Sequence, residues 1–71
     1  MNTIYTLTGY DSWQYMKKAY ISKNKKQLEN IMLTLTDAEI CEHNYIDENE
    51  YNEIIIWFLN TNDYKKLEFL Q

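Results

Sequence analysis

Apolar residues recur at helical spacing through the second half of the chain. From Tyr51 to Leu59 they fall at positions i, i+3, i+4, i+7 and i+8, which places them on one side of a helix. Asp47 stands where an N-cap is expected, and Glu50 follows three residues later, as in a capping box. Ile46 and Tyr51 have the spacing of a hydrophobic staple. The pattern predicts a helix over 48–60. Its buried face would consist of Tyr51, Ile54, Ile55, Phe58 and Leu59.

Three further segments carry a cap-like pair followed by apolar residues at helical spacing. The pairs are Asp11 with Gln14, Asn24 with Gln27, and Thr36 with Glu39. They predict helices over 12–21 and 25–35 and a short helix over 37–43. A second staple, Tyr10 with Tyr15, supports the first of these. The expected core residues are Ile31, Leu35, Ile55 and Phe58.

Both ends of the chain favour extended structure. Residues 3–8 are β-branched, aromatic or aliphatic and stop at Gly9, the only glycine, and residues 64–71 alternate weakly. We expect these two segments to be strands that pair with each other. The predicted fold is a single domain over 1–71, mainly α with a small β component, in a compact helix-turn-helix-like bundle.

Residues 25–69 together resemble a winged helix-turn-helix domain. The resemblance rests on the striped segment Leu28–Leu35, the sequence Thr36-Asp-Ala-Glu-Ile-Cys41, the helix Asp47–Leu59, and a wing-like strand over Tyr64–Phe69. It implies that the third of these is a recognition helix that enters the DNA major groove. The outward positions of that helix carry acids and amides and no cation, whereas phosphate contacts require Lys or Arg. We therefore expect direct DNA binding to be the less favoured use of this surface.

Composition and charge indicate the cellular compartment and the kind of genome expected for this chain. The 71 residues have a net charge of −4, and the charges are segregated: residues 12–26 hold five lysines and no acid, while residues 27–64 hold nine acids and no lysine. One cysteine cannot form an internal disulfide, and no apolar run approaches the ~20 residues of a membrane span. A cytoplasmic protein of a bacterial cell is expected. The absence of Arg, Val and Pro beside abundant Asn, Ile, Lys and Tyr indicates an AT-rich genome, which suits a bacterium or its phage.

Candidate chemistry is sparse. Cys41 and His43 are possible metal ligands, but a structural zinc site needs about four, and on a helix these two would point about 200° apart. The run that starts Asp47-x-Asn49 begins like a calcium loop, but Asn52 stands where that loop needs glycine. We expect a non-enzymatic protein without metal or cofactor.

The outer face of the helix over 48–60 is the candidate functional surface. Its candidate protein-binding residues are Asn49, Glu50, Glu53, Ile56 and Trp57. The leading hypothesis is an acidic protein-binding module that occupies the basic nucleic-acid groove of a host protein, as a phage or mobile-element inhibitor of the anti-defence type would. One alternative is a small winged-helix transcriptional regulator that binds DNA through its lysines: Lys17, Lys18, Lys23, Lys25 and Lys26. Another is a structural homodimer that buries Trp57.

Overall fold

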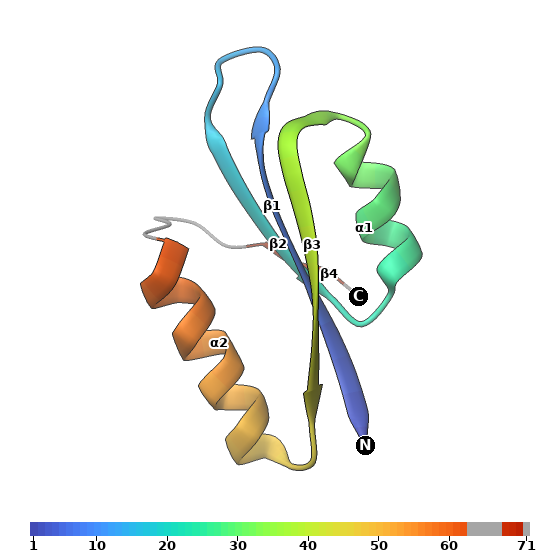
Figure 1. Cartoon of the computed structure of the whole chain (residues 1–71), viewed down its shortest axis with the longest axis vertical. Helices are drawn as coiled ribbons and strands as arrows, with labels where there is room; N and C mark the ends of the chain where they lie inside the picture. The colour runs from blue at the N-terminus through green and yellow to red at the C-terminus, as the bar shows by residue number, and fades with distance from the viewer. Residues whose placement is uncertain (63–67, 71) are drawn as a thin grey trace.

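A computed structural model describes residues 1–62 and 68–70, which form a four-stranded sheet and two helices (Figure 1). The elements in chain order are β1 (Asn2–Asp11), β2 (Lys17–Ser22), α1 (Lys25–Met32), β3 (Leu35–Tyr45), α2 (Glu48–Asn62) and β4 (Glu68–Leu70). The spatial order of the strands is β3-β1-β2-β4. β1 runs antiparallel to β2 and β3, and β4 runs parallel to β2. More described residues lie in strands than in helices, so the expected mainly helical, helix-turn-helix-like bundle is wrong.

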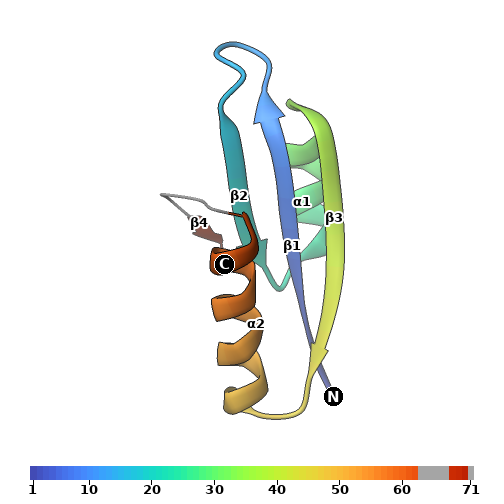
Figure 2. The same cartoon turned by 60° about the vertical axis from the view of Figure 1, so that its left-hand side comes forward.

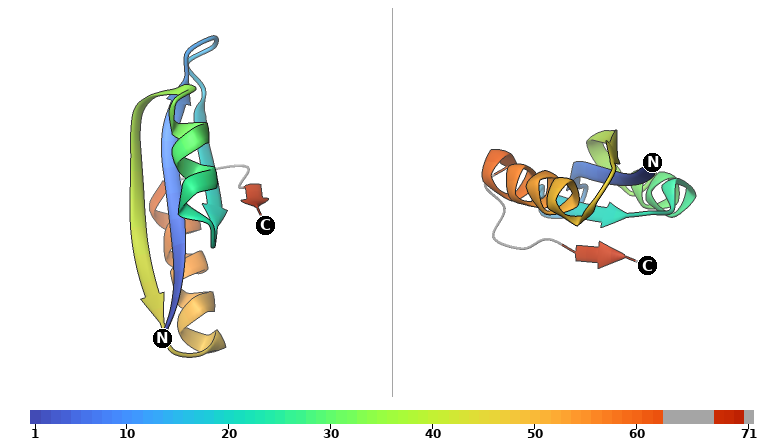
Figure 3. Two further views of the ribbon diagram at one scale, coloured as in Figure 1. Left: turned by 90° about the vertical axis from the view of Figure 1, so that its right-hand side faces the viewer. Right: turned by 90° about the horizontal axis from the view of Figure 1, so that it is seen from below.

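The central strand β1 is buried on both faces of the sheet. Ile4 and Thr6 point to one face, Leu7 points to the other, and all three are almost fully shielded from solvent. Such two-sided burial requires a cover on each face. The two helices supply it: α1 packs on one face and α2 on the other (Figures 2 and 3).

The topology explains why the helices lie on opposite faces. The chain passes from β2 through α1 to β3, and β3 is parallel to β2 with β1 between them. It then returns across the sheet in the other direction, from β3 through α2 to β4. Crossovers between parallel strands keep one hand, so reversing the direction of travel moves the second helix to the other face.

The helix expected over 25–35 is confirmed, although it ends at Met32. Its N-cap is the expected one, because the side chain of Asn24 accepts a hydrogen bond of 3.3 Å from the Gln27 amide. Ser22 fixes the preceding turn by donating its hydroxyl to the Gln27 side-chain oxygen at 2.9 Å. Leu28 is completely buried. The chain then turns so that Leu35 begins β3 instead of ending the helix.

The helix expected over 48–60 is also confirmed, as α2. Asp47 caps it by accepting a 3.0 Å hydrogen bond from the Glu50 amide, and the Glu50 carboxylate accepts one of 2.7 Å from the Ile46 amide. The predicted buried face is correct for Phe58, which is buried, and correct in part for three residues that are half-buried, but wrong for Leu59, which is 38% exposed. The three half-buried residues pack against the cluster of Ile4, Ile21 and Tyr45; they are Tyr51, Ile54 and Ile55.

Not every expected contact at the start of α2 forms. Ile46, predicted to staple against Tyr51, is 74% exposed. Tyr45 packs against Tyr51 in its place, with the two ring centroids 5.2 Å apart. Tyr45 is the last residue of β3 and is buried, so the contact joins the sheet to the first turns of the helix.

The helix expected over 12–21 is wrong, because this segment forms a hairpin turn and β2. Asp11 does accept a hydrogen bond of 2.7 Å from the Gln14 amide, but its own amide donates to the Met16 carbonyl and closes the turn. Tyr15 adopts a left-handed backbone with φ of 53°. Its ring stacks on Tyr10 at 4.7 Å, so the expected tyrosine contact exists within a turn.

The short helix expected over 37–43 is wrong as well, because this segment belongs to β3. Asp37 has a φ of 53°, and the pairing between β1 and β3 shifts register at this point. Gly9 lies opposite the irregularity, where a Cβ would come within 3.0 Å of the Leu35 side chain. From Glu39 to Tyr45 the pairing with β1 is regular.

The pairing expected between the two ends of the chain is wrong. The C-terminal strand is β4, and it pairs with β2, with Ile21 opposite Phe69. Residues 64–67 of the predicted strand lie outside the described residues. Within the described part of the chain, neither helix has the length and apolar character needed to cross a membrane.

Candidate protein-binding surface

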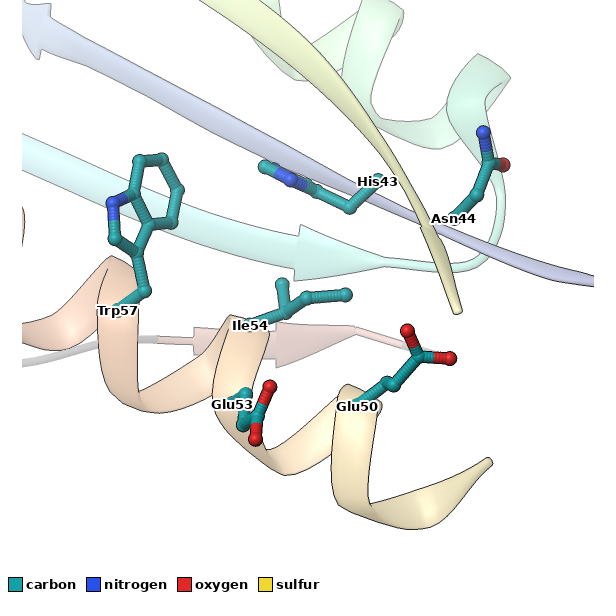
Figure 4. Close-up of a pocket in the computed structure, with 6 residues that line it drawn as sticks. All are labelled: His43, Asn44, Glu50, Glu53, Ile54 and Trp57. Carbon is teal, nitrogen blue, oxygen red and sulfur yellow. The ribbon is translucent and has the colours of Figure 1, made fainter. Parts of the chain in front are cut away.

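A pocket of about 270 Å³ lies between the end of β3 and the outer flank of α2 (Figure 4). β3 contributes two of its lining residues and α2 contributes four. The lining residues are His43, Asn44, Glu50, Glu53, Ile54 and Trp57. Ile54 is the aliphatic residue of this lining.

Trp57 and His43 form the pocket's aromatic wall. Their ring centroids lie 5.5 Å apart in an edge-to-face arrangement. His43 Nε2 lies 3.0 Å from the hydroxyl oxygen of Thr6, a buried residue of β1. Partial burial lowers the pKa of His43 below 6.5, so the imidazole is neutral at pH 7. It therefore contributes no positive charge beside the carboxylates.

The acidic side of the pocket comes from the first turns of α2. Glu50 uses one carboxylate oxygen to cap the helix at the Ile46 amide. Glu53 is exposed and stands one turn further along, on the same flank. A pocket lined by two carboxylates and an indole suits a basic side chain, because the carboxylates accept charge-assisted hydrogen bonds and the ring attracts a cation.

The structure brings together three of the five residues predicted from sequence: Glu50, Glu53 and Trp57. Asn49 and Ile56 are exposed on α2 but do not line the pocket. Ile56 is 57% exposed and Trp57 is 50% exposed. Sequence reasoning missed His43 and Asn44, since it placed them at the end of a helix; the i, i+2 alternation of Cys41, His43 and Tyr45 along a strand was the available signal.

The lysines of the alternative DNA-binding hypothesis are spread out. Lys17 and Lys18 begin β2, and Lys25 and Lys26 begin α1. At ~3.3 Å per residue, the six steps from Lys17 to Lys23 span roughly 20 Å. Neighbours in a strand point to opposite faces, so Lys17 and Lys18 diverge. Lys17 and Lys18 therefore lie at the opposite end of β2 from the other three lysines.

Lys23 lines a different pocket, of about 280 Å³, together with Tyr45, Glu48 and Tyr51. One of the five candidate lysines therefore shares a pocket lining with an acid at the start of α2.

The expected arrangement of Cys41 and His43 needs correction. Both lie on β3, and residues two apart in a strand share a face, so they do not diverge as on a helix. Cys41 is half-buried, and its thiol lies 3.7 Å from a Glu39 carboxylate oxygen. Burial, with the nearby Glu39 charge, raises the pKa of Cys41 above its usual value near 9.0. Among the described residues, no three His, Cys, Asp or Glu side chains group as a metal site would require.

Trp13 is a second exposed aromatic residue that the sequence misplaced. It falls in the segment predicted as a helix over 12–21, whereas it lies in the turn between β1 and β2 and is 90% exposed. The Asx-type turn at Asp11 was the signal for this outcome. Trp13 lies outside the pocket.

None of the family models, curated proteins or solved structures compared with this chain matches it.

Proposed function

We propose that this chain is a non-enzymatic protein-binding module whose pocket between α2 and β3 receives a basic side chain of its partner. The observation that carries the proposal is the composition of that pocket: two carboxylates, Glu50 and Glu53, line it together with the half-exposed indole of Trp57. No lysine occurs between Gln27 and Tyr64, so the chain supplies no cation of its own from α2 or β3. The lining described for the pocket contains no lysine, so a basic side chain from a partner fits the site.

The partner that fits is a protein with a basic groove that normally holds nucleic acid. An acidic surface competes for such a groove because both it and the phosphate backbone are recognised by Lys and Arg. Occupation of the groove would make this chain an inhibitor of a nucleic-acid-handling complex, of the anti-defence type expected of a phage or mobile element. Its site of action would be the bacterial cytoplasm.

Affinity capture from bacterial lysate, with and without nuclease, tests the proposal. Tagged wild-type chain is compared with a variant that combines Glu53→Gln and Trp57→Ala. The matched control combines Glu29→Gln and Leu33→Ala, which removes one exposed acid and one exposed apolar side chain from the region of α1.

We expect a stoichiometric protein that survives nuclease, binds the wild-type and control chains, and is lost from the test variant. Recovery of DNA alone, abolished by Lys25→Ala with Lys26→Ala, would instead establish the DNA-binding regulator. Equal capture by the test and control variants would remove the pocket from consideration.

A further inference from the structure

β3 presents an unpaired edge. Within the described residues it is the last strand of the sheet and pairs only with β1, so alternate N–H and C=O groups on its other side have no strand partner there. Among the described residues, no element lies beyond this edge (Figures 2 and 3). With 11 residues it is also the longest strand described. Proteins usually keep exposed edges short, so a long free edge calls for an explanation.

The second half of this edge has regular geometry. The irregularity at Asp37 is confined to the start of β3, and each residue from Glu39 to Tyr45 has a single partner on β1. Seven residues at ~3.3 Å each extend for roughly 23 Å. That length accommodates the pairing of one average strand.

The charged residues beside the β3 edge indicate which kind of segment would pair with it. Glu39 and Glu42 are exposed and lie on opposite faces of β3, and the pocket acids Glu50 and Glu53 lie beyond its end. A second copy of this chain would bring the same acids against them, which like-charge repulsion disfavours. A basic segment would find a carboxylate on either face.

We propose that the partner supplies an extended, basic segment that pairs with β3 along Glu39–Tyr45 and adds a fifth strand to the sheet. Paired strands lie about 4.8 Å apart, so the residue opposite His43 would stand beside the pocket and could place its basic side chain there. Main-chain pairing gives affinity, and the side chains on each face give the preference for Lys and Arg. The inference rests on the proposed function and specifies how the partner binds.

The probe is a capped nonapeptide that alternates arginine with valine, titrated into the wild-type chain by calorimetry. Two further peptides carry N-methyl groups, one on every arginine and the other on every valine. A strand paired along one edge donates only alternate amides, so one methylated peptide should bind at least tenfold more weakly and the other within about threefold of the parent. A fourth peptide with citrulline in place of arginine tests charge alone.

Amide hydrogen exchange of the chain provides the second readout. Binding of the parent peptide should protect alternate amides within Glu39–Tyr45 and leave those between them unchanged. Glu39→Gln with Glu42→Gln should weaken binding at least threefold, whereas the single control Glu29→Gln should not change it.

The outcomes separate this inference from the proposed function. Equal binding of both methylated peptides, with weaker binding of the citrulline peptide, would overturn strand addition and leave the acidic pocket standing. Absence of binding by the parent peptide at 1 mM would overturn both. A homodimer in sedimentation whose formation excludes the peptide would show that the edge pairs with a second copy, and the basic segment would be wrong.

Discussion

At the scale of single residues, the contact between His43 and Trp57 allows the protonation of His43 in the pocket to be measured by fluorescence. The ring centroids are 5.5 Å apart, and a protonated imidazole quenches indole emission at such range. Burial holds the pKa of His43 below 6.5. We therefore expect Trp57 fluorescence to stay constant around pH 7 and to fall as the pH drops through a midpoint below 6.5. The measurement uses a Trp13→Phe background, which leaves one tryptophan.

The same lowered pKa has a consequence for stability. The unfolded chain protonates its histidine near 6.5 and the folded chain at a lower pH, so the unfolded state binds more protons in that window. The contribution of His43 to stability is therefore complete above pH 6.5 and is lost as the pH falls through the folded pKa. His43→Gln should remove both the fluorescence midpoint and this part of the pH dependence. A midpoint that persists in this variant would contradict the assignment.

Asp37 gives a second prediction at this scale. Its backbone is left-handed, and its carboxylate accepts a hydrogen bond of 3.0 Å from the Tyr15 hydroxyl. Asn tolerates this backbone better than Ala does, so Asp37→Ala should be less stable than Asp37→Asn by about 1 kcal/mol in urea denaturation. Tyr15→Phe removes the hydrogen bond and keeps the backbone. Equal stability of the Ala and Asn variants would show that the turn does not depend on this conformation.

At the scale of elements, the sequence predicted the two helices and the strands near both ends of the chain correctly, and it predicted two further helices wrongly. Asn24 and Asp47 cap real helices, and residues 3–8 lie within β1. The pair Asp11 and Gln14 makes the same local hydrogen bond, but in a turn. A side chain that accepts from the amide three residues later stabilises either structure, so the pattern alone does not distinguish them.

The segment from Thr36 to His43 was misassigned for a different reason. Its strand conformation depends on pairing with β1, about 35 residues earlier in the chain, as in Thr6 opposite Cys41. No local spacing encodes such a partner, and Glu39 and Ala38 by themselves favour a helix. The half of the pocket built on α2 was therefore predictable, and the half built on β3 was not.

The packing of α2 gives a prediction for this scale. Phe58 is 2% exposed and anchors the helix, so Phe58→Ala should lower the free energy of unfolding by about 3–5 kcal/mol, a large share of the ~5–15 kcal/mol typical of a domain. Chemical denaturation measures the change. Ile56→Ala on the same helix is the matched control and should cost under ~1 kcal/mol, since Ile56 is 57% exposed. A stable Phe58→Ala variant would show that α2 is held by other contacts.

At the scale of the whole molecule, the order of the strands and helices determines where the acidic and basic residues lie. Five of the seven lysines lie between the start of β2 and the start of α1, and the other two fall outside the described residues, while β3 and the start of α2 carry most of the acids. Because β3 is an edge strand and α2 leaves from its end, those acids gather along one side of the sheet. A field of one sign on one side steers an oppositely charged partner toward that side before contact.

The kinetics of partner binding test whether this field and the pocket act together. Glu50→Gln with Glu53→Gln keeps the cap geometry, because the amide oxygen still accepts, and should mainly slow association. Trp57→Ala should mainly speed dissociation and cost about 2 kcal/mol or more. Association of the wild-type chain should slow as salt rises, since exposed charges are screened within ~10 Å at 0.1 M. Surface plasmon resonance with the captured partner gives both rate constants, and denaturation of the same variants confirms that they are folded. If a folded Trp57→Ala chain dissociates at the wild-type rate, the indole makes no energetic contact, and binding must use another part of the acidic side.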